Sequence, residues 1–206
     1  MNAIPGTVMA NFGNQVLVQD INKLRYRCPK RNAINQLVAG DRVLIREERS
    51  QFDGDLKGSI VAKLPRKNEL SRPNSQRKLC PVAANIDFIL VIVSSVPTPQ
   101  PELIDRYVVA SESLGIAPIL VLNKSDLLEE NLQLKRSIRD LLSIYEKLDY
   151  TIVETSAKQH KTRNLKKILK GKTSILVGQS GVGKSSLINE LLNRKATAVG
   201  PLSKGI

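Results

Sequence analysis

The sequence predicts a small all-β barrel of the OB type followed by an α/β domain built on a parallel sheet. Up to about Arg72, short β-like runs are separated by Gly, Asn, Asp and Pro. After Pro81, apolar strand-like runs alternate with amphipathic helix-like segments. One of the later strands leads into a glycine-rich loop and a helix. We therefore expect a barrel at residues 1–72, a linker at 73–81 and the α/β domain at 82–206.

The first domain contains four runs with strand character and little helical periodicity. They cover residues 7–18, 23–27, 42–47 and 58–64. Several short strands separated by turn residues are typical of a five-stranded OB-type barrel, and a small SH3-like barrel is the alternative.

The segment at residues 63–78 differs from both domains, with the sequence KLPRKNELSRPNSQRK. It is dense in Lys, Arg, Asn, Ser and Pro and has few apolar residues, which predicts an exposed linker or loop. The same composition makes it a candidate RNA contact, and a plain solvated linker is an equally good interpretation.

The second domain repeats a pattern of strand followed by helix. Strands are expected at residues 86–95, 119–122, 151–154 and 173–177, and helices at 101–114, 128–148, 162–169 and 184–192. Strands that alternate with helices imply a parallel sheet with helices on its faces.

The composition indicates a polyanionic partner. Of 206 residues, 32 are Lys or Arg and 19 are Asp or Glu, which gives a formal net charge of +13. The charge is spread over sequence that looks folded, without a Gly-Arg-rich tail, so a structured RNA is the expected partner. A solubilising cationic surface is the alternative.

Cysteine usage and hydropathy indicate a cytoplasmic protein without a membrane partner. Cys28 and Cys80 are far apart and show no Cys-x-x-Cys spacing, so neither a disulfide framework nor a pair of zinc ligands is expected. The longest apolar run, around residues 88–93, is too short to cross a bilayer, and the N-terminus lacks a basic segment followed by an apolar one.

The glycine-rich loop matches the phosphate-binding pattern G-x-x-x-x-G-K-[ST]. Its predicted cofactor-binding residues are Gly178, Gln179, Ser180, Gly181, Val182, Gly183, Lys184, Ser185 and Ser186. Glycines let backbone N–H groups turn toward phosphates, and the helix N-terminus adds partial positive charge. Lys184 would reach the β and γ phosphates, and the Ser185 hydroxyl would bind Mg²⁺.

A second motif, NKSD, follows the strand at 119–122 and comprises Asn123, Lys124, Ser125 and Asp126. An ionised Asp126 can accept hydrogen bonds from N1–H and the 2-amino group of guanine, and adenine offers no such pair of donors. Alone, this tetrapeptide is ordinary turn chemistry. A P-loop ATPase or kinase is a further alternative, and NKSD argues against it.

The segment after the strand at 151–154 reads Thr155-Ser156-Ala157-Lys158. Because ligands gather at the carboxyl ends of parallel strands, this loop, NKSD and the phosphate loop would form one pocket for GTP or GDP. Ser156, Ala157 and Lys158 would belong to this pocket, and the Ala157 N–H would contact the guanine 6-oxygen.

Two other features carry less weight. His160, the single histidine, lies in a polar stretch and is expected at the surface. Asp55-x-x-Gly58 matches the D-x-x-G of GTPase switch loops but lies in the barrel region, so we interpret it as a turn rather than a switch.

The order of the motifs is the reverse of that in Ras-like GTPases, because NKSD and TSAK precede the phosphate loop. A barrel followed by NKSD, SAK and GQSGVGKSSLIN resembles the RsgA (YjeQ) family of circularly permuted GTPases of small-subunit biogenesis. The resemblance implies an OB-fold domain that contacts rRNA and a P-loop GTPase domain that acts on the small ribosomal subunit. It also implies that Asn123, Lys124 and Asp126 read guanine.

The chain departs from the family pattern after the phosphate-loop helix. Family members continue into two switch segments and a zinc domain, whereas this sequence ends at Ile206, and its stretch at 199–205 resembles the approach to the first switch. We therefore expect an incomplete, monomeric GTPase domain without the zinc site, in which no catalytic residue is assigned and GTP turnover is nearly absent. The alternative is an RNA-binding module with a catalytically silent nucleotide domain.

Overall fold

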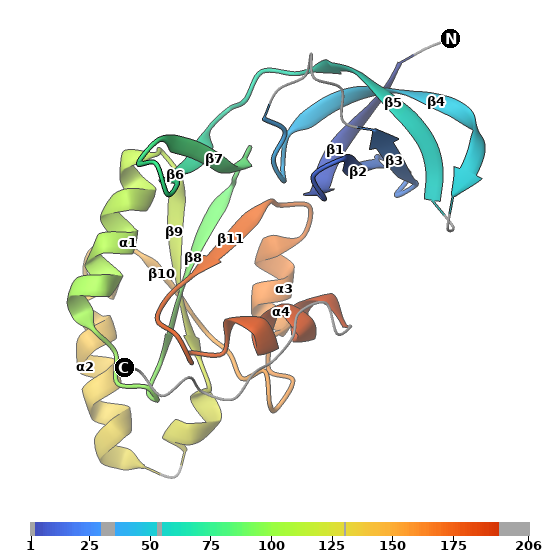
Figure 1. Ribbon diagram of the computed structural model, residues 1–206. Coiled ribbons are helices and arrows are strands. Elements are labelled where there is room, and N and C mark those ends of the chain that lie inside the picture. Colours follow the sequence, from blue (N-terminus) through green and yellow to red (C-terminus); the bar gives the residue numbers. More distant parts are fainter. Residues whose placement is uncertain (1–2, 30–35, 53–54, 130, 194–206) are drawn as a thin grey trace. The chain divides into compact units, whose positions relative to one another are not determined.

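The computed structural model describes residues 3–29, 36–52, 55–129 and 131–193, with residues 49–52 described by their backbone alone. Contacts divide the chain into two compact units, Met1–Ile86 and Asp87–Ile206, whose elements are labelled in Figure 1. The stretch at 199–205, expected to lead into a switch, lies outside the described residues.

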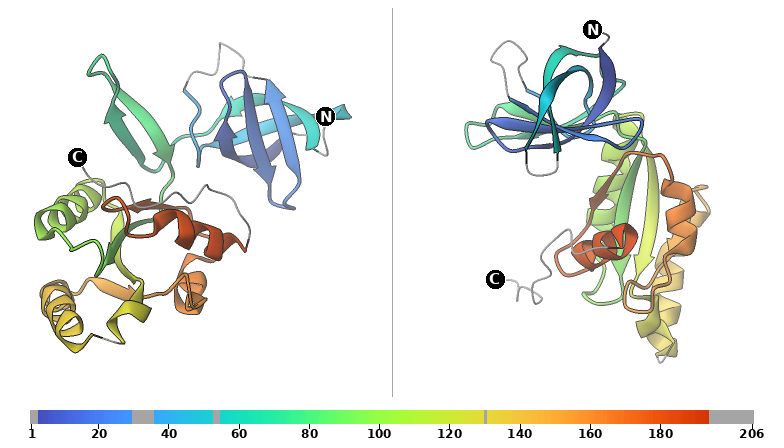
Figure 2. Two further views of the ribbon diagram at one scale, coloured as in Figure 1. Left: turned by 60° about the horizontal axis from the view of Figure 1, so that its bottom comes forward. Right: turned by 90° about the vertical axis from the view of Figure 1, so that its right-hand side faces the viewer.

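Unit 1 contains a closed five-stranded barrel, as the sequence predicts. Its strands are β1 (Ile4–Asn11), β2 (Gln15–Asp20), β3 (Arg25–Pro29), β4 (Arg42–Phe52) and β5 (Asp55–Lys63). They follow the order β1-β2-β3-β5-β4, and Figure 2 shows the barrel from two sides. Alternate side chains point inward, so Val16 and Val18 of β2 are buried together with Val8, Tyr26 and Ile45 from neighbouring strands.

Two expectations within the barrel are wrong. The run at 7–18 is two antiparallel strands, joined by a turn in which Gly13 has a φ of +82°. The exposed Phe12 at this turn made the run look continuous. Asp55-x-x-Gly58 is the start of β5 and not a turn, because Gly58 pairs with Glu47 of β4.

The segment expected to be an exposed linker instead contains a hairpin. Strands β6 (Glu69–Pro73) and β7 (Leu79–Ala84) pair antiparallel around a turn in which the Asn74 side chain accepts bonds from two backbone N–H groups. The strands carry too little apolar alternation to be recognised, since side chains anchor the base of the hairpin instead. For example, Asn85 Nδ2 donates to the Gly40 carbonyl. The hairpin therefore belongs to unit 1, which ends at Ile86 rather than near residue 72.

Arg66 makes the largest polar anchor at this base. Its Nε and Nη2 donate to the two carboxylate oxygens of Asp41 at 2.7 and 2.8 Å, and Asp41 has 0% side-chain exposure. Arg66→Ala would remove both guanidinium hydrogen bonds from this buried carboxylate and leave Lys63, at 4.0 Å, as its cation, so we expect the free energy of unfolding to fall by about 3 kcal/mol. Urea unfolding followed by circular dichroism measures this change. The exposed Arg72→Ala of β6 is the control, and an equal loss in both variants would contradict the prediction.

Unit 2 is a four-stranded parallel sheet with helices on both faces, as predicted. Its strands are β8 (Phe88–Ser94), β9 (Ala117–Asn123), β10 (Thr151–Glu154) and β11 (Ser174–Val177), in the order β10-β9-β8-β11. The helices are α1 (Pro101–Ser113), α2 (Leu132–Glu146), α3 (Arg163–Leu169) and α4 (Lys184–Leu192), with a short 3-10 helix, η1 (Ser125–Leu128), after β9.

The two pairs of helices cover opposite faces of this sheet. Helices α1 and α2 lie on one face and α3 and α4 on the other (Figures 1 and 2). The central strand β8 is consequently buried on both sides, from Ile89 to Val93. Among the described residues, β11 pairs with β8 and with no strand on its other side. No helix in the described part of the chain is long and apolar enough to span a membrane.

Candidate nucleotide-binding site

The glycine-rich loop joins the end of β11 to the start of α4, as the sequence predicts. Gly178 has a φ of +143°, and a Cβ there would lie 2.4 Å from the Ile92 carbonyl oxygen of β8. Gly183 has a φ of +91°, and its Cβ would lie 2.5 Å from Asn123 Nδ2. Both positions require glycine, because their positive φ values disfavour other residues and because a Cβ would clash with its neighbour. The loop is therefore packed tightly against the carboxyl ends of β8 and β9.

The Lys184 side chain folds back over this loop. Its Nζ donates to the carbonyl oxygens of Gly178 at 2.9 Å and of Gln179 at 2.8 Å. Burial lowers the pKa of the Lys184 ammonium from its ordinary value. The amine is held where phosphate oxygens could replace the two carbonyls. Ser185 follows at the second position of α4.

Asn123 and Lys124 connect the NKSD loop directly to the phosphate loop. Asn123, which is 1% exposed, donates from Nδ2 to the Val182 carbonyl at 3.0 Å. Lys124 Nζ donates to the carbonyls of Gly181 at 2.7 Å and Val96 at 2.8 Å. Burial lowers the pKa of Lys124, and the nearby Asp126 carboxylate acts in the opposite direction. These two side chains hold the phosphate loop in place, a role that their residue types and spacing do not indicate.

Val96 belongs to a loop after β8 that carries none of the predicted site residues. Sequence reasoning missed it because its contribution is a backbone carbonyl, for which the residue type gives no signal. Ser94 Oγ also donates to this carbonyl, at 2.8 Å. The Val96 carbonyl therefore joins the β8 loop to the NKSD loop through Lys124.

Asp126 and Ser156 connect the NKSD loop to the TSAK loop. Ser156 Oγ donates to Asp126 Oδ1 at 2.5 Å, and the Ser125 N–H donates to the Thr155 carbonyl at 3.1 Å. Thr155 Oγ1 also donates to Asn123 Oδ1 at 3.3 Å. These bonds orient the Asp126 carboxylate and place Ala157 beside it.

A cavity of ≈ 210 Å³ lies between the three loops. It is lined by Asn123, Lys124, Asp126, Leu127, Ala157, Lys158, Gly183 and Ser186. Members of all three predicted motifs border one space, as the sequence analysis expects. The carboxylate of Asp126 gives this space a hydrogen-bond acceptor, and the phosphate loop adjoins it.

His160 is a surface residue, as expected, with its side chain 78% exposed. Its Nδ1 lies 2.7 Å from Glu190 Oε2 of α4, and Lys166 Nζ lies 3.4 Å from the other oxygen of that carboxylate. The contact with His160 is the main cause that lowers the pKa of Glu190. Glu190 thus links the segment after the TSAK loop to the helix that follows the phosphate loop.

The NKSD loop after β9 precedes the phosphate loop after β11 along the chain, and this order defines unit 2 as a circularly permuted P-loop GTPase domain. The family model described as RsgA GTPase matches residues 63–206. The chain belongs to this family, which confirms the resemblance seen in the motifs.

Curated relatives and solved structures agree with this assignment. The small ribosomal subunit biogenesis GTPase RsgA of Pseudomonas syringae pv. tomato is 46% identical over 205 residues, which cover 97% of this chain and 57% of that protein. The RsgA of Pseudomonas putida is 43% identical over the same shares. The chain thus spans little more than half the length of these relatives.

Among solved structures, YjeQ from Thermotoga maritima has a TM-score of 0.73 and 34% identity, over 92% of this chain and 65% of that one. YloQ, described as a circularly permuted GTPase, has a TM-score of 0.73 and 28% identity, over 91% of this chain and 64% of that one.

Proposed function

We propose that the chain binds GTP and GDP in the cavity between the three loops. The observation that carries this proposal is the pair of contacts from Asn123 and Lys124 to the carbonyls of Val182 and Gly181. They fix a guanine-reading loop and a phosphate-binding loop at a constant separation. One nucleotide could then engage both loops without reorganising either.

Each motif contributes a different part of the recognition. Asp126, oriented by Ser156, would accept bonds from N1–H and the 2-amino group of guanine, and the Ala157 N–H would donate to its 6-oxygen. Lys158 and Ser125 would flank the base. The backbone N–H groups of residues 178–186 and the Lys184 ammonium would bind the phosphates.

The residues present also fit a magnesium ion. Mg²⁺ prefers oxygen ligands and is commonly bound through few protein groups together with substrate phosphates. Ser185 supplies a hydroxyl next to Lys184, where a bound nucleotide would bring its own phosphate oxygens. The metal would neutralise negative charge on the phosphates during hydrolysis.

For the whole protein we propose GTP hydrolysis in late maturation of the small ribosomal subunit, with binding to its rRNA in the cytoplasm. The names of the relatives and the net charge of +13 support this role. We assign no catalytic residue, because γ-phosphate sensing and positioning of the attacking water require groups that the sequence does not identify. We further propose that the protein acts as a monomer. The second candidate is an RNA-binding module with a silent nucleotide domain.

Equilibrium binding of fluorescent GDP, with Mg²⁺ present, tests the nucleotide site. Competition by unlabelled GTP and GDP, and none by ATP, is the expected result, because adenine cannot satisfy the Asp126 carboxylate. Equal competition by ATP would contradict guanine selection. If a folded chain failed to bind GDP at all, the RNA-binding alternative would replace the proposal.

A further inference from the structure

The strongest concentration of charge in unit 2 lies on α3 and the residues that flank it. Residues 158–172 contain no Asp or Glu and seven cations, which are Lys158, Lys161, Arg163, Lys166, Lys167, Lys170 and Lys172. We name these seven residues the α3 strip. Seven positive charges without an acidic residue give this short segment +7 of the net charge of +13.

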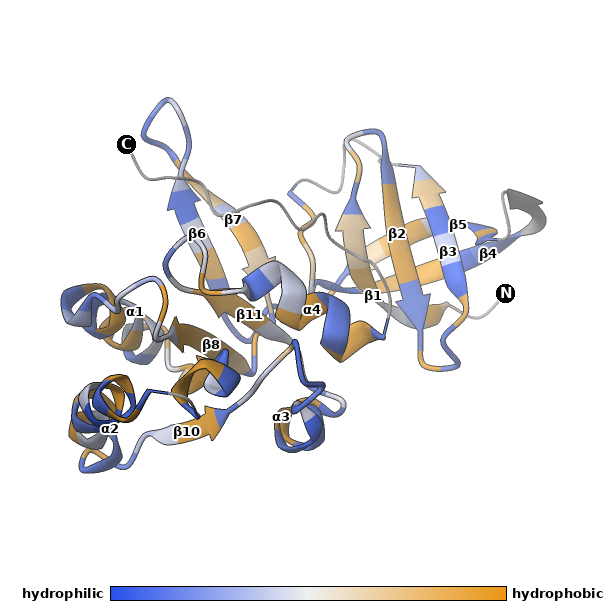
Figure 3. Ribbon diagram, turned by 90° about the horizontal axis from the view of Figure 1, so that it is seen from below, coloured by the Kyte–Doolittle hydropathy of each residue, from blue (hydrophilic) through white to orange (hydrophobic). Residues whose placement is uncertain are grey.

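The helix directs the three cations that it contains outward. Arg163, Lys166 and Lys167 follow the i, i+3, i+4 spacing of one helical face. Leu165 is fully buried in the core of unit 2, and Ile168 and Leu169 pack against the same core. Figure 3 shows the hydrophilic colour that covers much of α3. The strip's three cations within α3 therefore lie on the solvent side of a helix whose other side packs against the sheet, and the other four flank this helix in the sequence.

Most of the cations in the strip have no acidic partner. Lys161 pairs with Glu129 at 2.8 Å and Lys166 with Glu190 at 3.4 Å. Among the described residues, Arg163, Lys167, Lys170 and Lys172 form no ion pair. Like charges three and four residues apart repel one another and destabilise a helix. Interaction with the helix dipole favours cations in the last turn only, so it does not account for the whole strip.

A neighbouring hollow of ≈ 860 Å³ is a poorer candidate for a polyanion. Lys135, Arg139, Lys161 and Arg163 line it, but so do four carboxylates, Glu129, Asp140, Glu146 and Glu154. An anionic ligand there would meet as many negative as positive side chains. The outer face of α3 and the residues after it carry positive charge alone.

The chemistry of the strip favours RNA over a membrane surface. Helices that bind a membrane interface combine cations with large exposed apolar side chains. None of the large exposed apolar residues among the described part of the chain falls within 158–172. Flexible lysines without aromatic neighbours suit phosphates whose sequence context does not matter.

We propose that the α3 strip is an RNA-phosphate-binding surface of unit 2, additional to any contact made by the barrel. The inference rests on the proposed role at the small ribosomal subunit. It places an RNA contact on the nucleotide-binding unit itself, in a segment that begins at Lys158, the last residue of the TSAK loop. The Lys166 and His160 contacts with Glu190 then connect the strip to α4.

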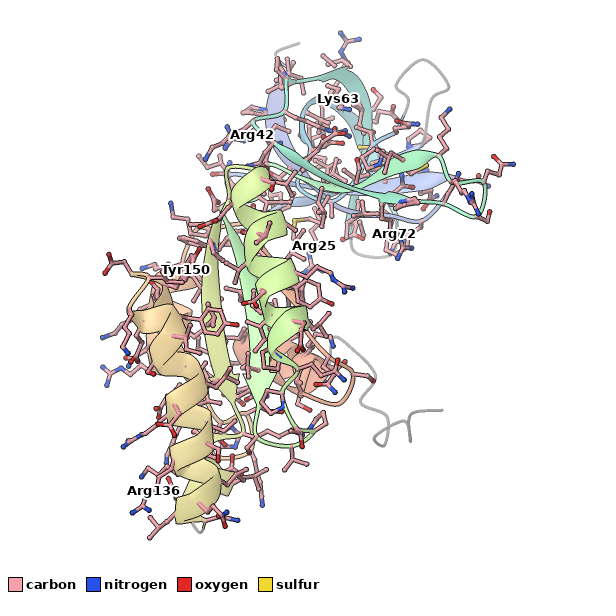
Figure 4. The ribbon with its side chains drawn as sticks, turned by 90° about the vertical axis from the view of Figure 1, so that its left-hand side faces the viewer. Arg25, Arg42, Lys63, Arg72, Arg136 and Tyr150 are labelled. Carbon is pink, nitrogen blue, oxygen red and sulfur yellow. The ribbon has the colours of Figure 1, made fainter. Side chains whose placement is uncertain are left out.

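The test compares two double charge reversals in the full chain. Lys167→Glu with Lys170→Glu removes two free cations of the strip. Arg136→Glu with Lys147→Glu makes the same change in net charge on α2 and at its C-cap. Both residues are exposed, and Arg136 points away from the sheet (Figure 4). Each variant is titrated against purified bacterial small ribosomal subunits over a series of salt concentrations, and binding of fluorescent GDP is measured in parallel.

We expect the α3 variant to lose at least about tenfold in affinity for the subunit near 0.1 M salt, and its log–log salt slope to fall by about 2. The α2 variant should lose less than about threefold, and both should bind GDP as the unchanged chain does. Equal losses in the two variants, or no loss in the α3 variant, would overturn the inference. If the α3 variant fails to bind GDP, a second double variant, Lys170→Gln with Lys172→Gln, is tested in its place under the same criteria. Both of these residues lie beyond the end of α3.

Failure of the proposed function gives a different result. In that case the unchanged chain would not bind the subunit at any salt concentration, although it still bound GDP, and the strip would lose its assigned partner. If the unchanged chain binds the subunit and the α3 variant binds it equally well, the result contradicts the RNA-binding role of the strip but not the proposed function.

Discussion

Replacing Asp126 by Asn is expected to lower the affinity for GDP by a factor of roughly a hundred to a thousand. The carboxylate would accept two hydrogen bonds from guanine, and an amide would place a donor against the guanine donors. Xanthine has an oxygen in place of the 2-amino group, so the same variant should gain affinity for XDP. The measurement is competition of fluorescent GDP by unlabelled GDP and XDP, made on the unchanged chain and on the Asp126→Asn variant at equal protein concentration.

Two observations make this substitution informative. Ser156 Oγ can donate to an amide oxygen as it does to Asp126 Oδ1, so the loop should keep its geometry. Asp140→Asn, on the exposed side of α2, removes one negative charge away from the cavity lining and serves as the control. If Asp126→Asn left the preference for GDP over XDP unchanged, Asp126 would not be the residue that reads the base.

The sequence predicts the fold best where local chemistry is strong. The four strands of unit 2 carry continuous apolar runs, and the phosphate loop combines a strand, glycines and a helix within a few residues. Such signals depend only on residues that are close together in the sequence, and the structure confirms the predicted strands and the phosphate loop. The polar hairpin of β6 and β7 and the turn at Phe12 gave misleading signals, because a weakly apolar strand and an exposed aromatic residue both contradict simple hydropathy patterns.

The same distinction holds at the candidate site. Residue types identified the three loops, and the cavity borders all three. What the sequence could not show is that Asn123 and Lys124 bind backbone carbonyls 59 and 57 residues away. Those carbonyls have no residue-specific signature, and the contacts depend on the sheet placing β9 and β11 on either side of β8. Sequence reasoning therefore found the groups that would contact the ligand more readily than those that hold the loops.

Lys184→Ala should cause the largest loss of phosphate binding. Among the described residues the ammonium forms no ion pair, and it donates to the carbonyls of Gly178 and Gln179. Phosphate oxygens would replace these neutral carbonyl acceptors, and because they are charged, each hydrogen bond from the ammonium would be stronger. Loss of the charge is expected to cost about 3 kcal/mol of binding free energy, or roughly a hundredfold in affinity for GTP and GDP.

The fold should tolerate this change, because the two released carbonyls lie on a half-buried loop that water can reach. Calorimetric titration with GDP measures the loss, and Lys147→Ala at the C-cap of α2 is the control of equal charge. Lys184→Arg should bind GDP nearly as poorly as the Ala variant, since a planar guanidinium cannot occupy the position of a compact ammonium in a loop this tight. Full affinity in the Ala variant would mean that the backbone of the loop binds the phosphates unaided. RNA affinity that falls together with GDP affinity would instead show that the two binding activities of the chain are coupled.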